Sequence, residues 1–119
     1  MHDKTIEQEI KACGADIAPR VTPADIEANI ASEYCFTAAQ GVVGGNLYHG
    51  EAYCYEKSLD LLTFCVLVLK NGFTVTGESA CASPENFNAE IGRKVARENA
   101  VAKIWPLMGY ELKQRLSEQ

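Results

Sequence analysis

The feature that most constrains the fold of this chain is an apolar run followed by the residues of a tight turn. Residues 61–69 (LLTFCVLVL) are apolar at odd and even positions alike apart from one threonine, and Asn71-Gly72 follows after a single lysine. Asn-Gly favours hairpin turns whose two central residues have positive φ. Residues 73–76 (FTVT) then resume a strand pattern. The sequence therefore predicts a β-hairpin with strands at about 61–69 and 73–80.

The first predicted strand is apolar on both faces, so both faces need cover. An antiparallel strand with one solvated face alternates apolar and polar residues, and this strand does not. We expect the helices of the chain to cover one face, and more of this protein or a second copy to cover the other. The resulting hypothesis is a homo-oligomer formed through the sheet and the helices.

Two helices are predicted before the hairpin. The first extends from Thr5 to about Cys13 and opens with a capping-box pattern. The second begins with Thr22 as N-cap and Pro23 at the first helical position. Its apolar face would carry Ile26, Ile30 and Tyr34. Residues 36–58, rich in glycine and small side chains without a sustained period, are predicted to form a long connection.

Two further helices are predicted after the hairpin. The segment Ser83-Pro84-Glu85 marks the start of a helix that runs from about Pro84 or Phe87 to Ile104. Trp105-Pro106 marks its end or a kink, because proline disfavours helical geometry in the residue before it, and Pro106 would open the last helix. The order helix, helix, hairpin, helix, helix is that of a small single-domain α+β protein.

Charge limits the possible partners. The chain has 11 Lys and Arg against 16 Asp and Glu, a net charge of −5, which excludes general electrostatic binding to DNA. Residues 88–119 are the exception, with 6 basic and 4 acidic side chains, and we expect any anionic ligand there. Neither a membrane span nor a signal peptide is evident, so we expect an intracellular protein without a membrane partner.

The predicted helix at 88–104 carries the candidate ligand-binding cations. Arg93 and Arg97 lie four residues apart on one face, with Lys94 beside them and Glu90 one turn earlier. Such a face can clamp phosphates, because each guanidinium offers a planar fork of donors. The alternative is a solvated face on which Glu90 pairs with Arg93 or Lys94.

Two asparagines near these cations are further candidates. Asn99 lies in a stripe of small residues on the same helix, and would either bond to a neighbouring turn or contact a ligand or a dimer mate. Asn86 and Phe87 belong to the segment before the helix, where backbone N–H groups can bind an anion. The alternative there is structural, with Ser83 as N-cap and Phe87 filling the core.

The sequence shows no constellation of catalytic residues. The five cysteines include no C-x-x-C pair and predict neither a zinc site nor a disulfide framework. Thiol catalysis would use Cys81 with His49 as base, and nothing in the sequence places His49 near Cys81. We therefore predict a protein that is not an enzyme and has no metal or cofactor.

Three segments of the chain are familiar: residues 61–69, residues 71–81 (NGFTVTGESAC), and residues 84–100 (PENFNAEIGRKVARENA) with Lys103-Ile104-Trp105. They closely resemble a family of small, gene-66-like proteins encoded by tailed phages and prophages, and the resemblance spans residues 61 to about 116. Residues 21–26 (VTPADI) and 36–39 (FTAA) also look like the family. The resemblance implies a single α+β domain at 21–119, preceded by a variable N-terminal helix or arm at 1–20.

That family is similar to the first type of Thoeris anti-defence protein, a phage sponge that sequesters signalling nucleotides. The similarity implies binding, without hydrolysis, of the cyclic ADP-ribose isomers made by bacterial TIR-domain enzymes, and extends to cyclic oligonucleotides. It also implies self-association as a dimer or hexamer, in the host cytoplasm.

The leading hypothesis is thus a phage or prophage anti-defence protein that captures a cyclic nucleotide. The expected contacts are cations on phosphate, amides on polar edges and an aromatic ring on adenine: Arg93, Arg97 and Lys94; Asn86 or Asn99; and Phe36, Phe73 or Phe87. The alternative is a protein-interaction or structural phage module that docks an acidic host protein through its basic helix. A third hypothesis is a small hydrolase of such nucleotides.

Overall fold

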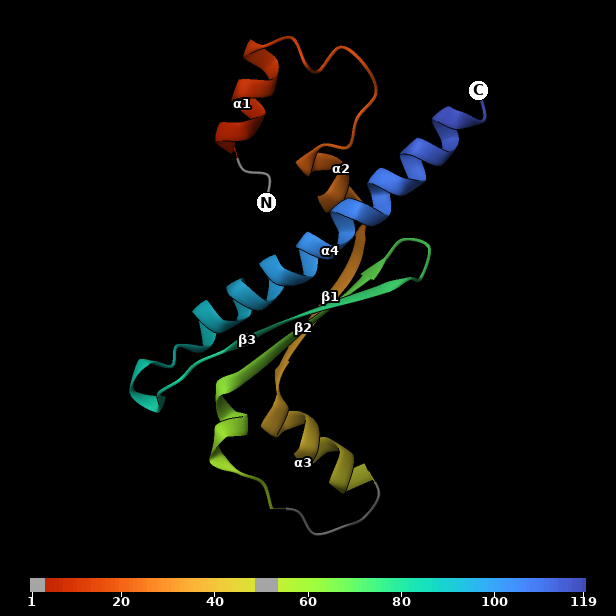
Figure 1. The fold of residues 1–119 in the computed structure, drawn as a ribbon. Coiled ribbons are helices and arrows are strands. Elements are labelled where there is room, and N and C mark those ends of the chain that lie inside the picture. Colours follow the sequence, from red (N-terminus) through yellow and green to blue (C-terminus); the bar gives the residue numbers. More distant parts are fainter. Residues whose placement is uncertain (1–3, 49–53) are drawn as a thin grey trace.

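A three-stranded antiparallel sheet, ordered β1 (Ile30–Thr37), β2 (Leu62–Leu69) and β3 (Thr74–Ala80), is the centre of the fold (Figure 1). The computed structural model describes residues 4–48 and 54–119. Four α-helices accompany the sheet in these residues: α1 (Lys4–Ala12), α2 (Pro23–Ala28), α3 (Ala38–Tyr48) and α4 (Ala89–Ser117). Two short 3-10 helices, η1 (Lys57–Leu61) and η2 (Pro84–Asn86), precede β2 and α4. The predicted small α+β domain is confirmed.

The predicted hairpin is also confirmed, with its turn at Asn71-Gly72. Gly72 has a φ of +90°, which glycine adopts without steric cost. The side-chain oxygen of Asn71 accepts the N–H of Phe73 at 2.9 Å, and the N–H of Leu69 donates to the Phe73 carbonyl at 2.8 Å. The turn therefore takes Phe73 out of the second strand, which begins at Thr74.

The predicted second helix is wrong beyond its first turns, because α2 ends at Ala28 and residues 30–37 form β1. Its predicted start is correct: Thr22 Oγ1 accepts the N–H of Asp25 at 3.1 Å, and the Asp25 carboxylate accepts the N–H of Thr22 at 2.9 Å. The apolar residues assigned to the predicted helix, Ile26, Ile30 and Tyr34, are four residues apart. An even spacing also suits the two-residue period of a strand, and hydrogen bonding to β2 decides for the strand.

The predicted long connection at 36–58 is wrong as well, because it contains α3 and η1. Thr37 and Gln40 form a capping box at the start of α3. The N–H of Gln40 donates to Thr37 Oγ1 at 3.2 Å, and the N–H of Thr37 donates to Gln40 Oε1 at 2.9 Å. Three glycines within α3, each costing roughly 1 kcal/mol relative to alanine, obscured this helix in the sequence. Residues 49–53 of the segment lie outside the described part of the chain.

The two helices predicted after the hairpin are a single helix, α4, with Pro106 inside it. The helix begins later than predicted: Ser83-Pro84-Glu85 leads into η2, and Asn88 caps α4 by accepting the N–H of Ile91 at 3.0 Å. Proline removes one intrahelical donor. The helix continues through Pro106 because Ile104, fully buried two residues earlier, holds it against the sheet.

The core lies between α4 and one face of the sheet. Its buried residues are Ile26, Cys65, Leu67, Leu69, Val75, Ala96, Ala100 and Ile104. Strand β3 lies directly against α4 at Gly77, where a Cβ atom would lie 2.2 Å from the nitrogen of Ala100 and 2.3 Å from the oxygen of Ala96. The stripe of small residues on α4 thus admits the backbone of the protein's own sheet.

The opposite face of the sheet has no comparable helical layer among the residues that the structure describes. The molecule measures 58 × 33 × 17 Å, and α1 and α3 lie beyond opposite ends of the sheet (Figure 1). Within the N-terminal arm, Arg20 donates to Glu7 of α1 at 2.6 Å. The predicted homo-oligomer stays a prediction.

Candidate functional site

Two adjoining hollows lie at the end of the sheet where β1 leads into α3 and where α4 begins. The smaller, of about 180 Å³, is lined by Cys35, Phe36, Thr37, Gln40, Thr63, Phe87, Ala89 and Arg93. The larger, of about 460 Å³, is lined by Thr37, Ala39, Gln40, Val43, Tyr55, Asp60 and Phe87. Because they share Thr37, Gln40 and Phe87, we treat them as one site, the Phe87 cleft.

Local structure fixes the walls of the Phe87 cleft. Thr37 ends β1, pairs with Thr63 of β2, and caps α3 through Gln40. Gly92 brings the first turns of α4 onto the sheet, because a Cβ there would lie 3.1 Å from Thr63 Oγ1. Phe87, half-buried between η2 and α4, is therefore held between the helix and the sheet end.

Arg93 supplies the positive charge of the cleft. It lies in the second turn of α4, is exposed, and has no hydrogen bond or ion pair with any described residue. By contrast, Lys94 pairs with Glu90 at 3.5 Å, as the structural alternative for this face predicted. A guanidinium beside an aromatic ring at the start of a helix is a suitable partner for a phosphate.

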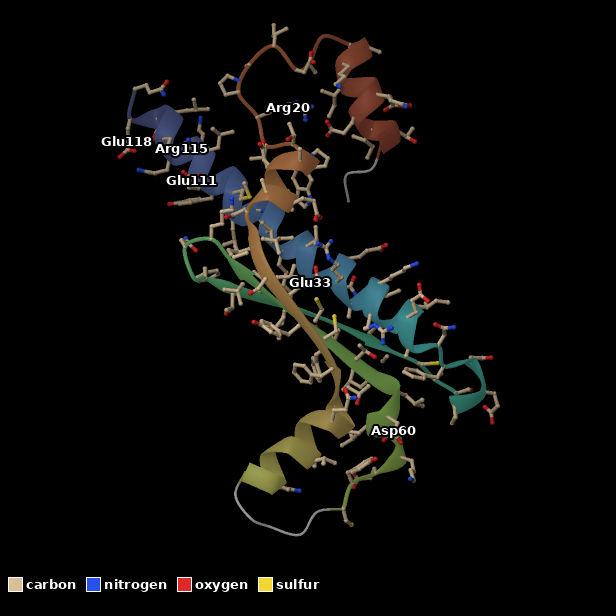
Figure 2. The ribbon with its side chains drawn as sticks, turned by 180° about the vertical axis from the view of Figure 1, so that it is seen from behind. Arg20, Glu33, Asp60, Glu111, Arg115 and Glu118 are labelled. Carbon is tan, nitrogen blue, oxygen red and sulfur yellow. The ribbon has the colours of Figure 1, made fainter. Side chains whose placement is uncertain are left out.

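Arg97, predicted to act beside Arg93, is engaged elsewhere. It donates to both carboxylate oxygens of Glu27 at 2.8 and 3.1 Å, and to Glu33 at 3.0 Å. Glu33 lies on β1 where α4 crosses the sheet (Figure 2). The hydrogen bond with Glu27 is the main reason that the pKa of Arg97 is raised, and the same bond lowers the pKa of Glu27. Arg97 joins α2, β1 and α4, so a phosphate would have to displace two carboxylates to reach it.

The other predicted contact residues are dispersed. Asn99 donates to the carbonyl of Glu78 at 2.8 Å. It thus bonds within the chain, as the structural alternative predicted, but to strand β3 and not to a turn. Phe73 lies in the β2–β3 turn at the far end of the sheet and lines a separate hollow of about 690 Å³. Asn86 is exposed in η2, next to Phe87. The ring of Phe36 borders the smaller hollow while contacting Phe64, with ring centroids 5.8 Å apart.

Sequence reasoning missed the side of the cleft that α3 and η1 build. The Tyr55 hydroxyl donates to Asp60 Oδ1 at 3.3 Å, and Asp60 lies in η1 beside α3 (Figure 2). The ammonium group of Lys57 lies 6.0 Å from the Tyr55 ring centroid. The capping-box spacing of Thr37 and Gln40 is the signal in the sequence that reveals α3.

The described residues contain little that suggests other chemistry. No group of three or more His, Cys, Asp or Glu within 4–48 and 54–119 could hold a metal ion. Cys81 Sγ donates to the carbonyl of Ser83 at 3.2 Å, and His49, the base considered for it, lies outside the described part. No described helix is long and apolar enough to cross a membrane.

Comparison with known proteins gives one match. The family model described as phage protein (N4 Gp49/phage Sf6 gene 66) family matches residues 21–116. No curated protein and no solved structure matches the chain.

Proposed function

This chain belongs to the N4 Gp49/phage Sf6 gene 66 family of phage proteins, and from that premise we propose that it is an anti-defence protein that sequesters a cyclic nucleotide immune signal. The ligand class is the cyclic ADP-ribose isomers and related cyclic oligonucleotides. The protein holds the ligand without hydrolysing it. It acts in the host cytoplasm, as a dimer or hexamer of itself.

The observation that carries the proposal is the meeting of Arg93 and Phe87 in one cleft. A nucleotide needs a cation for phosphate and a ring for the base, and the sequence predicted both residues for these two roles. Stacking on an aromatic ring contributes about 1–3 kcal/mol per base. A charged hydrogen bond contributes about 1.5–3 kcal/mol.

The size of the Phe87 cleft also supports a nucleotide. Small-molecule sites usually enclose about 300–1,000 Å³. The smaller hollow is below this range at about 180 Å³, and the larger, at about 460 Å³, brings the site into it. In this arrangement a phosphate lies at Arg93, and the base extends past Phe87 toward Tyr55.

Calorimetric titration with cyclic ADP-ribose isomers and with cyclic di- and trinucleotides tests the proposal. Chromatography of the ligand released by heating the complex tells sequestration from hydrolysis. Tight binding with intact ligand supports the proposal. Recovery of a linear product would make the protein a hydrolase, and no heat with any nucleotide would favour the alternative, docking of an acidic host protein through α4.

Arg93→Ala and Lys103→Ala form a matched pair for the site assignment. Each removes one exposed cation from α4, and only Arg93 lines the cleft. We expect Arg93→Ala to weaken binding by about 1.5–3 kcal/mol, and Lys103→Ala to bind as wild type. Equal affinities for the two variants would show that the Phe87 cleft is not the nucleotide site.

A further inference from the structure

The two charged residues of the Phe87 cleft lie in different hollows. Arg93 of α4 lines the smaller hollow, and Asp60 of η1 lines the larger one. No other charged side chain among the described residues lines either hollow. Phe87, Thr37 and Gln40 form the wall that both hollows share. The cleft therefore has a positive end at α4 and a negative end at η1.

Asp60 is held in place and keeps the capacity to bind a ligand. The Tyr55 hydroxyl donates to its Oδ1 atom at 3.3 Å, and both residues are half-buried. An ionised carboxylate accepts at about four lone-pair sites, so one donor leaves most of them for other partners. The nearest cation in the sequence, Lys57, lies over the ring of Tyr55 and lines neither hollow. A carboxylate held in this way accepts hydroxyl and amine donors and repels a phosphate.

Cyclic nucleotides differ in where their negative charges lie. In a cyclic ADP-ribose isomer the phosphates are joined as a pyrophosphate, so the charges lie together and the rest of the ring carries ribose hydroxyls and adenine. In a cyclic dinucleotide the phosphates lie on opposite sides of the ring, and in a cyclic trinucleotide they are spread around it. When one phosphate lies at Arg93 and the base extends past Phe87, a phosphate on the far side of the ring faces Asp60. Like charges brought together in a binding site disfavour the ligand that carries them.

We infer that Asp60 is a specificity-determining residue of the Phe87 cleft, and that it selects nucleotides whose phosphates are joined as a pyrophosphate over cyclic di- and trinucleotides. The Asp60 carboxylate accepts a hydrogen bond from a ribose hydroxyl or the adenine amine of a cyclic ADP-ribose isomer. It repels the distant phosphate of a cyclic dinucleotide. This inference rests on the proposed function and narrows its ligand class, because a cleft with one cation and one carboxylate at opposite ends suits a ligand that is anionic at one end only.

Calorimetric titration of the full chain with a cyclic ADP-ribose isomer and with cyclic di-AMP tests the inference. We expect the wild type to prefer the cyclic ADP-ribose isomer by at least about tenfold. Asp60→Asn keeps the shape of the side chain and an acceptor oxygen for Tyr55. It should weaken binding of the cyclic ADP-ribose isomer by about tenfold, because a charged hydrogen bond is about twice as strong as a neutral one. Binding of cyclic di-AMP should strengthen by about tenfold, because the repulsion is removed.

Glu56→Gln is the matched control. It removes the same charge from an exposed residue just before η1 that lines neither hollow. This variant should keep the preference of the wild type. A preference that depends on ligand size alone would be the same in all three proteins.

The outcomes separate this inference from the proposed function. A preference that Asp60→Asn abolishes or reverses, and that Glu56→Gln retains, supports the role of Asp60. Equal affinity of the wild type for both ligands, or a preference that Asp60→Asn leaves unchanged, would overturn that role while nucleotide sequestration stands. A wild type that binds neither ligand contradicts the proposed function and the inference with it. Far-ultraviolet circular dichroism verifies that Asp60→Asn is folded, and Asp60→Ser provides a second variant without the charge.

Discussion

The two faces of the sheet differ in cover although β2 supplies apolar residues to both. On the α4 side, glycine and alanine bring backbones together, and Cys65 and Leu67 are fully buried. On the face that points away from α4, Tyr34, Val66 and Thr76 have no helical layer over them among the described residues. The ring of Phe36, at one end of that face, lies beside Gly41 of α3. An apolar strand face therefore indicates only that the face needs cover, whereas a stripe of small residues on a helix indicates which face the chain covers with its own helix.

The largest expected effect comes from adding one methyl group to the face of the sheet that packs against α4. In Gly77→Ala the new Cβ would meet the backbone of α4 at 2.2 Å, so the helix has to move away from β3. We expect the free energy of unfolding to fall by at least about 3 kcal/mol, at the upper end for overpacked cores. Urea denaturation measures this.

Thr76→Ala, one residue away on the face of the sheet that points away from α4, is the control for that experiment. It shortens an exposed side chain of the strand and should lower the free energy of unfolding by no more than about 1 kcal/mol, the span of strand propensities. If the two variants lower the free energy of unfolding equally, β3 is not packed more tightly on its α4 side than on its other side.

A smaller effect is expected at the ion pair between Arg97 and Glu27, beside the face of the sheet that packs against α4. The pKa of Glu27 is lowered in the folded protein. Its contribution to stability is therefore present above the unfolded pKa, and is lost as the pH falls from about 4.5 through the folded pKa. Arg97→Gln should cost about 1 kcal/mol or less at pH 7, because the pair is partly exposed.

Urea titrations of wild type and Arg97→Gln at pH 7 and pH 3.5 check this expectation. The stability difference between the two proteins should shrink at the lower pH, because the stabilisation that the Glu27 carboxylate gains from Arg97 is lost as the pH falls from about 4.5 through the folded pKa. A difference that is the same at both pH values would show that the pairing with Arg97 is not responsible.

The smallest effect is chemical and leaves stability unchanged. Burial, together with a hydrogen bond to Cys35, raises the pKa of the Cys65 thiol to about 12. At pH 8 only about one Cys65 in ten thousand would be a thiolate, the form that reacts. We expect iodoacetamide to modify the exposed Cys13 and Cys54 while Cys65 stays intact, as peptide mass spectrometry would show. Modification of Cys65 at the rate of Cys13 would mean that α4 leaves the sheet readily.

The sequence predicts best where a structural signal is local. Asn71-Gly72 and the apolar run define the hairpin within a few residues, and Thr22-Pro23 defines the start of α2. Strand β1 is harder to predict from the sequence, because the spacing of its apolar residues suits a helix equally and its partner strand is distant in the sequence. The cost of glycine in α3 hides a helix that the Thr37 capping box starts.

The candidate site shows the same limit. Spacing alone put Arg93 and Arg97 on one helix face, and this is where they are, but the carboxylates that bind Arg97 come from α2 and β1. Pairing over 64 and 70 residues of chain cannot be predicted from local periodicity. The roles proposed for Arg93 and Phe87 rest on residue chemistry, while the place of Tyr55 in the wall of the cleft depends on a helix that the sequence concealed.

The connection between β1 and β2 also sets an order of assembly. Four residues join β2 to β3, whereas 24 separate the end of β1 from the start of β2. Closing the longer loop costs more chain entropy, so we expect the hairpin and α4 to form first, and β1 to join last and detach first. Because β1 ends in Thr37 at the wall of the Phe87 cleft, a ligand held there would slow amide hydrogen exchange along β1 before it slowed exchange in the hairpin.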